Sequence, residues 1–174
     1  MKKTAYFNSE DIKGWPRPEE LRPYFLAPPG QEWFDTGGND GALLTAEGLY
    51  GTENEDGLTG NRVDVDLYLY GQPGLGVMLL YNKYGGGYGE HFNSKGDMSR
   101  LKEIVRDVQG GAIPVGLLVP FPAAFEAVKE FIETDGELPK SIEWIADKDL
   151  PPDTLPDPAE EWLARQRHSE TRSR

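Results

Sequence analysis

One stretch, residues 121–145 (FPAAFEAVKEFIETDGELPKSIEWI), constrains the fold most, because it specifies a helix, a stop and a strand in that order. Proline is tolerated in the first helical turn, whose amides have no intrahelical partner, so Pro122 is the predicted first helical residue. The residues spaced for one helical face are apolar, namely Ala124, Phe125, Val128, Phe131 and Ile132. Gly136 and Pro139 end the helix. The alternation from Ser141 to Ile145 then predicts a strand with one buried face.

The length of 174 residues suits one domain with tails, large enough to bury a core without disulfides. There is no cysteine, as is common in a reducing cytoplasm, and no apolar run of the length that a signal peptide or membrane span needs. We therefore expect a soluble cytoplasmic protein with a lead-in at residues 1–35, a folded core at 36–146 and a tail at 147–174. The tail is rich in proline and then basic, and its end, His168 to Arg174, is predicted to be disordered.

Val63 to Tyr70 has the clearest strand pattern in the chain. One face of this strand would carry Val63, Val65, Leu67 and Leu69. The opposite face would carry Asp64, Asp66, Tyr68 and Tyr70. Two carboxylates beside two amphipathic rings suit recognition of a partner, although tyrosine is also common on strands that bind nothing.

Further strands are predicted on both sides of this one. Ala42 to Leu49 reads as a first strand, and Gly76 to Tyr84 is nearly all apolar, as is typical of a central strand covered on both faces. Gly85 to Gly87 would then reverse the chain into a hairpin partner at Tyr88 to Phe92. Loops are predicted at Thr36–Gly41 and, rich in acid, at Gly51–Asn61.

Two regions outside this pattern have weaker signals. Residues 1–17 show no clear element, and Pro23 is expected to limit a helix at Glu19–Leu26 to about one turn. Four aromatic residues of this lead-in are expected to anchor it to the core, namely Trp15, Tyr24, Phe25 and Trp33. Near the C-terminus, Asp157 and Pro158 could begin a last short helix that runs through Trp162 and Leu163.

The segment from Met98 to Val108 allows two interpretations. A helix with Asp97 as its N-cap would place Leu101, Ile104, Val105 and Val108 on one face. The alternative is two short strands that turn at Gly110-Gly111, since the same residues suit a strand. With either outcome, we expect a single α+β domain that has a mainly antiparallel sheet with two or three helices packed on one face.

Sequence motifs for catalysis and metal binding are missing. The patterns HExxH, GxSxG and the Walker A phosphate loop do not occur, and the only histidines are His91 and His168. Histidine-based metal or triad chemistry is therefore disfavoured, and we expect no cofactor, no metal and no enzyme activity. A small hydrolase that uses Asp64, Asp66 or Glu90 is the alternative, because the α-carbons of Asp64 and Asp66 on one strand face would stand about 7 Å apart, which does not forbid a carboxylate pair.

The formal net charge of −12 argues against a nucleic-acid binder, because phosphate binding draws most of its affinity from lysine and arginine. The charge is also uneven. Residues 31–66 contain nine acids against Arg62 alone, and residues 126–161 contain twelve acids against three lysines. Such a field speeds encounter with a basic partner, and simple solubility is the alternative explanation.

The sequence from Ile113 to Trp144 resembles the C-terminal signature of immunity-protein family one, whose members occur beside deaminase toxins in bacterial polymorphic toxin systems. The apolar segment IPVGLLVP leads into AAFEAVKEFIETDGELPKSIEW. The matching features are the proline-led helix with Ala127-Val128 and Glu130-Phe131, the stop at Thr134–Gly136, Pro139, and the strand of Trp144. Upstream, Gly38–Gly41 before an apolar strand is similar in layout. The resemblance covers about residues 36–145.

This resemblance implies an α+β domain that binds and neutralises a cognate toxin, commonly a nucleic-acid deaminase, without a cofactor and without catalysis. The matching residues are core and turn positions, so they identify the family and leave the contact surface open. From the charge and the strand pattern we expect the toxin to contact Glu53, Glu55, Asp56, Asp64, Asp66, Tyr68 and Tyr70. The expected partner is a basic toxin domain, and neither nucleic acid nor a membrane is expected to be bound. A generic interaction domain with a partner other than a deaminase is the remaining alternative.

Overall fold

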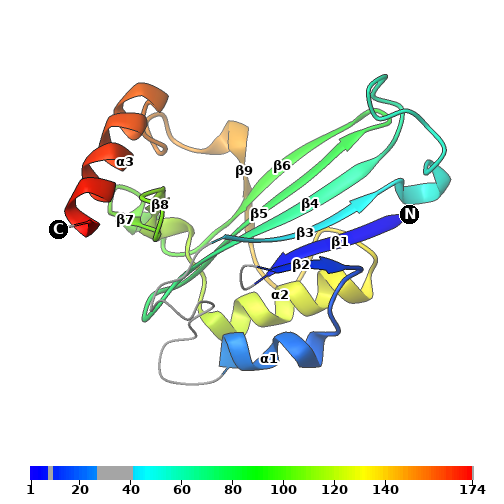
Figure 1. The fold of residues 1–174 in the computed structure, drawn as a ribbon, viewed down its shortest axis with the longest axis horizontal. Coiled ribbons are helices and arrows are strands. Elements are labelled where there is room, and N and C mark those ends of the chain that lie inside the picture. The colour runs from blue at the N-terminus through cyan, green and yellow to red at the C-terminus, as the bar shows by residue number, and fades with distance from the viewer. Residues whose placement is uncertain (8–9, 27–40, 174) are drawn as a thin grey trace.

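The computed structural model describes residues 1–7, 10–26 and 41–173. Within these ranges the chain forms a seven-stranded antiparallel sheet in the order β2-β1-β3-β4-β5-β6-β9, a separate two-stranded sheet β7-β8, and three α-helices (Figure 1). The predicted single α+β domain with a mainly antiparallel sheet is confirmed.

The strands of the large sheet are β1 (Lys2–Phe7), β2 (Glu10–Lys13), β3 (Gly41–Glu47), β4 (Asp64–Gln72), β5 (Gly76–Gly85), β6 (Tyr88–Ser94) and β9 (Trp144–Ala146). The small sheet pairs β7 (Ile104–Arg106) with β8 (Ala112–Pro114). The helices are α1 (Pro18–Leu26), α2 (Phe121–Glu133) and α3 (Pro158–Arg172). Short 3₁₀ turns occur at Leu49–Gly51, Met98–Arg100, Val115–Leu117 and Asp147–Asp149.

Helices α1 and α2 lie side by side along one face of the large sheet (Figure 1). The apolar face predicted for α2 is buried in the main core, where the ring of Phe131 packs 4.9 Å from that of Trp15 and 6.2 Å from that of Tyr81. Phe25 of α1 meets Phe125 of α2 at 5.9 Å. This face of the sheet is therefore closed by helices.

The opposite face of the sheet is covered only at one end. There Met78 and Tyr70 pack with residues of the β7-β8 region, such as Ile113 and Leu117, in a second apolar cluster. This region and α3 lie at that end in Figure 1. Strand β5 is consequently buried on both faces between Gly76 and Leu79, whereas Tyr84 near its other end is exposed. The prediction of a fully covered β5 holds for the first four of its ten residues.

The N-terminal segment departs from the prediction. Residues 2–7 and 10–13 form strands β1 and β2, and only two apolar side chains of β1, Ala5 and Phe7, point into the core, which is too few for a clear alternating pattern. Helix α1 continues past Pro23 for its full nine residues, because burial of Leu21 and Phe25 outweighs the local cost of the proline.

The helix considered for Met98–Val108 is wrong, and the alternative of two short strands is correct. The reversal is fixed by Asp107, whose Oδ1 accepts hydrogen bonds from the amides of Gln109 and Gly111, while Gly110 takes a positive φ of 84°. Val105 and Ile113 thereby reach the second apolar cluster. Asp97 does act as an N-cap, although only of one 3₁₀ turn.

His168 to Arg172 are helical, contrary to the disorder predicted for His168–Arg174, because α3 continues to Arg172. Residue 174 lies outside the described residues. Asp157 caps this helix as expected, accepting from the amides of Ala159 and Glu160. The helix is held on β7-β8 by polar contacts, in which Glu161 binds Arg106 at 3.0 Å and Arg172 donates to the carbonyl of Val108 at 2.8 Å. Because α3 is held by polar contacts, it has no apolar stripe, and the sequence therefore shows no pattern that would predict its packing.

Two smaller predictions differ slightly from the structure. The strand predicted at Ser141–Ile145 is shorter, since β9 begins only at Trp144, after bends. Helix α2 begins at Phe121, with Pro122 in its first turn. The loop predicted at 36–40, Trp33, and the carboxylates of Glu32, Asp35 and Asp40 lie outside the described residues.

Candidate partner-binding surface

The face of the sheet opposite α1 and α2 is uncovered over most of its width, and we name this part the open face. The register aligns side chains in rows across five strands, for example Thr4, Thr45, Asp66, Asn82 and His91. All its members are half-buried or exposed. They are Thr4 and Tyr6 of β1, Leu43, Thr45 and Glu47 of β3, Asp66 and Tyr68 of β4, Asn82 and Tyr84 of β5, and His91 of β6. At the end of the sheet near β7-β8, three of them, Tyr6, Leu43 and Tyr68, line a pocket together with Arg165 of α3.

Asp66 lies near the middle of the open face, in an environment that disfavours its charge. Burial raises the pKa of its carboxyl above the ordinary value, and the nearby charges of Asp64 and Glu47 add to this shift. The hydroxyl of Tyr84, which donates to Oδ2 at 3.2 Å, acts in the opposite direction. Raised carboxyl pKa values occur at functional sites and also in structural networks, so the shift makes Asp66 a candidate contact residue and no more.

The cost of the Asp66 charge leads to a prediction. Because the folded-state pKa lies above the unfolded value, ionisation of Asp66 lowers stability at neutral pH, and this loss is recovered as the pH falls through the folded pKa. Asp66→Asn, whose amide oxygen can still accept from Tyr84, is therefore expected to be at least as stable as the natural chain at pH 7. Urea denaturation should show the two proteins converging as the pH approaches 4. A variant clearly less stable at pH 7 would contradict this.

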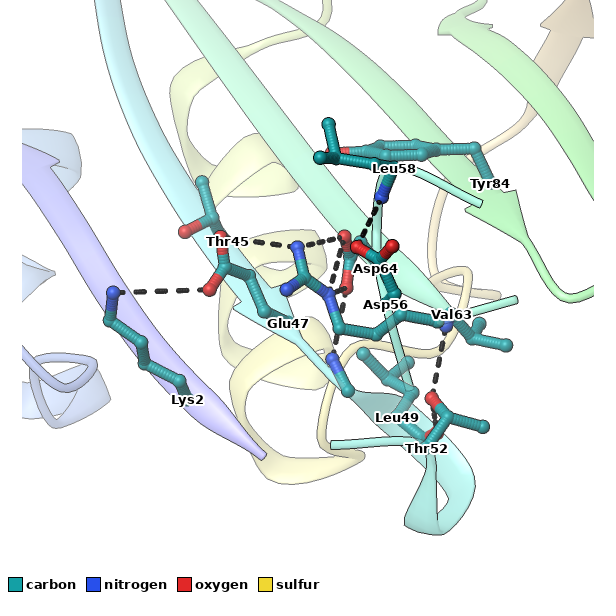
Figure 2. Close-up of polar contacts among 12 residues, drawn as sticks. Lys2, Thr45, Glu47, Leu49, Thr52, Asp56, Leu58, Val63, Asp64 and Tyr84 are labelled. Carbon is teal, nitrogen blue, oxygen red and sulfur yellow. Dashed lines mark hydrogen bonds and ion pairs between the residues drawn. The ribbon is translucent and has the colours of Figure 1, made fainter. Parts of the chain in front are cut away.

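Asp64 shares the face of Asp66 in sequence terms but is only 5% exposed. The guanidinium of Arg62 binds it through two nitrogens, with Nε 2.9 Å from Oδ1 and Nη2 2.9 Å from Oδ2 (Figure 2). The amide of Gly48 also donates to Oδ1 at 2.9 Å, and Glu47 lies 3.5 Å from the same arginine. Asp64 therefore fastens the base of the loop between β3 and β4, and it is not the free carboxylate that the hydrolase alternative needs.

The loop that Asp64 fastens, residues 48–63, carries the other acidic residues singled out in the sequence. Glu53, Glu55 and Asp56 are all exposed there. Thr52 stabilises the loop internally, since its hydroxyl donates to the carbonyl of Leu49 and accepts from the amide of Val63 (Figure 2). The loop follows β3 and precedes β4, so these carboxylates continue the open face at the end where Glu47 and Tyr84 lie.

The seven residues predicted to contact a partner are thus only partly brought together. Asp66 and Tyr68 lie on the open face, and the loop acids adjoin it. Asp64 is turned inward to Arg62, and Tyr70 packs against the second apolar cluster. The exposed part of the predicted set therefore consists of Asp66, Tyr68 and the loop.

A cluster around Lys83 was not anticipated from the sequence. Lys83 is 4% exposed, and its ammonium donates to the hydroxyl of Tyr50 at 2.8 Å and to Glu137 at 3.2 Å. Tyr50 in turn donates to Glu137, and the ammonium lies 5.2 Å and 5.1 Å from the ring centres of Tyr50 and Tyr88. Burial disfavours the charge of Lys83, but these hydrogen bonds outweigh it and raise its pKa.

This cluster holds two exposed tyrosine rings in fixed positions beside the acidic loop. Tyr50 is 56% exposed and Tyr88 is 41% exposed, with ring centres 5.9 Å apart. Tyr50 has a positive φ of 57°, which is unfavourable for a side chain of this size and persists only where its contacts fix it. Nothing in the sequence signals the positive φ of Tyr50. Lys83 could have been noticed, because it is a charged residue in a strand that is nearly all apolar.

The described residues contain no group of three or more histidine, aspartate or glutamate side chains arranged to hold a metal ion. None of the described helices is long and apolar enough to span a bilayer. What the geometry defines is an α+β protein whose candidate binding surface is an open sheet face with three tyrosines and two carboxylates, Glu47 and Asp66.

Comparison with known families agrees with that class. The family model of the immunity protein Imm1 matches residues 33–146, which is more than half of the chain, so the protein belongs to the Imm1 immunity protein family. No curated protein matched the chain. Membership confirms the resemblance seen in the sequence and makes the chain an immunity protein with a cognate toxin as partner. It also suggests an inhibitor that is not itself a catalyst.

Proposed function

We propose that this immunity protein neutralises a nucleic-acid deaminase toxin by placing its open face and acidic loop over the entrance through which the toxin admits its substrate. The observation that carries the proposal is the open face itself, where Asp66, Tyr68 and Tyr84 are displayed on an uncovered sheet. A toxin that binds nucleic acid needs a basic entrance, and a negatively charged cover complements it. The deaminase chemistry is expected from the family resemblance and not from the surface.

The proposal includes a cellular setting. The chain would act in the cytoplasm of the toxin-producing cell, with no cofactor and no catalysis of its own. Its net charge of −12 would both steer it to the toxin and keep it off nucleic acid.

A titration of deaminase activity tests the proposal. The cognate toxin domain would be purified and given a single-stranded DNA or RNA substrate, with increasing amounts of the immunity protein. We expect activity to fall to background at one equivalent, and the inhibition to be competitive with substrate. Full activity in excess immunity protein would refute neutralisation, and inhibition without loss of substrate binding would refute the blocked entrance.

The acidic loop is expected to act mainly on the association rate. Reversing its charge with Glu53→Lys, Glu55→Lys and Asp56→Lys should slow association at least tenfold at low salt, and less at high salt, because long-range attraction is screened. Stopped-flow or surface-based kinetics at two ionic strengths would measure this.

The matched control reverses three exposed acids elsewhere, through Glu19→Lys, Glu126→Lys and Glu133→Lys. This control changes the net charge by the same amount but at the helical side of the molecule. Equal slowing by both sets would mean that only total charge matters and that the loop is not the point of approach.

A further inference from the structure

Half of strand β6 is an unpaired edge of the large sheet. Strand β9 pairs with β6 only from Phe92 to Ser94, and beyond Ala146 the chain leaves the sheet for a 3₁₀ turn. The preceding residues of β6, 88–91, pair with β5 on one side and with no described strand on the other. Figure 1 shows this part of β6 extending past β9.

The hydrogen-bond alternation identifies which backbone groups are free there. In an antiparallel pair, every second residue directs both its amide and its carbonyl to the same neighbour. The amide of Lys95 donates to the carbonyl of Glu143, so the odd-numbered residues of this strand face the β9 side. Gly89 and His91 therefore present their amides and carbonyls outward. The imidazole of His91 does not shield them, because its Nδ1 lies 2.9 Å from Asn82 Oδ1 on the open face.

A groove lies directly beside this edge, on the helical side of the sheet. Its volume is about 630 Å³, and it is lined by Glu90 and Phe92 of β6 and by the apolar side chains of Leu138, Ile142 and Trp144. The charged residues of its lining besides Glu90 are Lys83, Glu130, Glu137 and Lys140. A strand added to β6 would direct alternate side chains into this groove. Backbone pairing with a pocket for alternate side chains is the arrangement by which exposed sheet edges bind extended peptides.

Glu90 determines which charge a strand added to β6 should carry. In the register it lies opposite Lys83, but the ammonium of Lys83 is bound to Tyr50 and Glu137. Within the described part of the chain, the carboxylate of Glu90 has no ion pair or hydrogen bond. A lysine or arginine directly across from Glu90 on an added strand would complement it.

The same residue disfavours a second copy of this chain as occupant. If two β6 edges paired antiparallel through Gly89 and His91, the two Glu90 side chains would lie directly opposite each other. Like charges in that position are destabilising. The edge is thus protected against self-association while remaining open to a basic strand.

We propose that an extended segment of the toxin adds to the sheet as a strand along residues 88–91 of β6, with a basic side chain facing Glu90 and an apolar one in the groove beside Trp144. This rests on the proposed function, since it specifies how the toxin is held. The open face and the β6 edge adjoin at His91, so one partner can contact both.

Amide hydrogen exchange tests the edge directly. In the free protein the amides of Gly89 and His91 are expected to exchange rapidly, and in the complex with the cognate toxin domain they should slow at least a hundredfold. The amides of residues 88 and 90, which face β5, should be slow in both states. Unchanged exchange of Gly89 and His91 in the complex would overturn the added strand.

Substitution gives a second test. His91→Pro removes an outward amide that β5 does not use, so the sheet should remain intact while toxin affinity falls about tenfold. His91→Ala keeps the amide and should bind more tightly than the proline variant. Glu90→Lys should also weaken binding about tenfold, in a salt-dependent way.

A matched proline on the other sheet edge serves as the control. The amide of Gly14 donates to the carbonyl of Lys3, and the same alternation places the amide of Asp11 outward on β2. Because Asp11 also carries a carboxylate beside Tyr6 of the open face, Asp11→Pro is compared with Asp11→Ala, and the two should have affinities within twofold of each other. If His91→Pro binds and inhibits as the natural chain does, the edge proposal fails while neutralisation stands. If the natural chain does not bind the toxin at all, both fail.

Discussion

Replacing Tyr68 by alanine is expected to weaken the complex with the toxin about a hundredfold while the chain stays folded. Tyr68 lies between Leu43 and Leu80 in the register of the open face, and its ring is only half-buried. Large aromatic side chains at the centre of an interface commonly contribute 2 kcal/mol or more, and a hundredfold change corresponds to about 2.7 kcal/mol. Burial raises the pKa of Tyr68, and the charge of Asp66 raises it further, so its hydroxyl remains a donor at neutral pH.

Calorimetric titration of the toxin domain with each variant would measure this loss. Tyr68→Phe removes only the hydroxyl and is expected to cost about tenfold or less, because the ring contacts remain. The control is Tyr24→Ala, on the helical side, where the ring of Tyr24 packs 4.9 Å from that of Phe7. That variant should lose stability but keep its affinity. If Tyr68→Ala binds like the natural chain, the interface lies elsewhere.

The parts of the fold that the sequence predicted are those with long, regular patterns. The apolar spacing from Ala124 to Ile132 could only be buried as one helical face, and the alternation of β4 fixed which of its residues point inward. The glycines at 85–87 marked the hairpin between β5 and β6. In each case local preference and burial agree, so no knowledge of neighbouring elements was needed.

The predictions that failed concern segments whose structure is decided by distant partners. Strand β1 is stable because it pairs with β3, which is far along the chain, and its own pattern is short. The end of α3 is ordered because Arg172 and Glu161 reach β7-β8. For residues 98–108, helical and extended patterns overlap, and the turn at Asp107 decides between them.

The candidate site shows the same division. The sequence predicted that Asp64 and Asp66 share a face, which is correct as geometry. It could not show that Arg62 and the amide of Gly48 enclose only Asp64, because that depends on how the loop folds back. The contact of Lys83 with Tyr50 and Glu137 joins residues 33 and 54 positions apart, so no local pattern could predict it.

Removing the Asp64 carboxylate is expected to lower the free energy of unfolding by about 2 kcal/mol, the second large effect that we predict. Four hydrogen bonds converge on this buried group, three from the Nε and Nη2 groups of Arg62 and one from the amide of Gly48. In Asp64→Ala the Gly48 amide would lose its side-chain acceptor, and the guanidinium would keep only Glu47 at 3.5 Å. Asp64→Asn would keep the bond from Gly48 but oppose its amide group to the arginine, so most of the loss should persist. Urea denaturation would measure both variants.

The matched control for Asp64 is Asp56→Ala, because Asp56 belongs to the same loop and bonds only locally, to the amide of Leu58. We expect its stability to change little, since exposed substitutions away from such networks have small effects. The comparison separates two roles of acidic residues in this loop.

If Asp64 fastens the loop, its removal should speed exchange of the Val63 amide and also slow toxin association, because Glu53 and Glu55 lose their fixed position. Asp56→Ala should affect association alone. Equal stability of the two variants would show that the loop is held by its turns and Thr52 and not by the buried carboxylate.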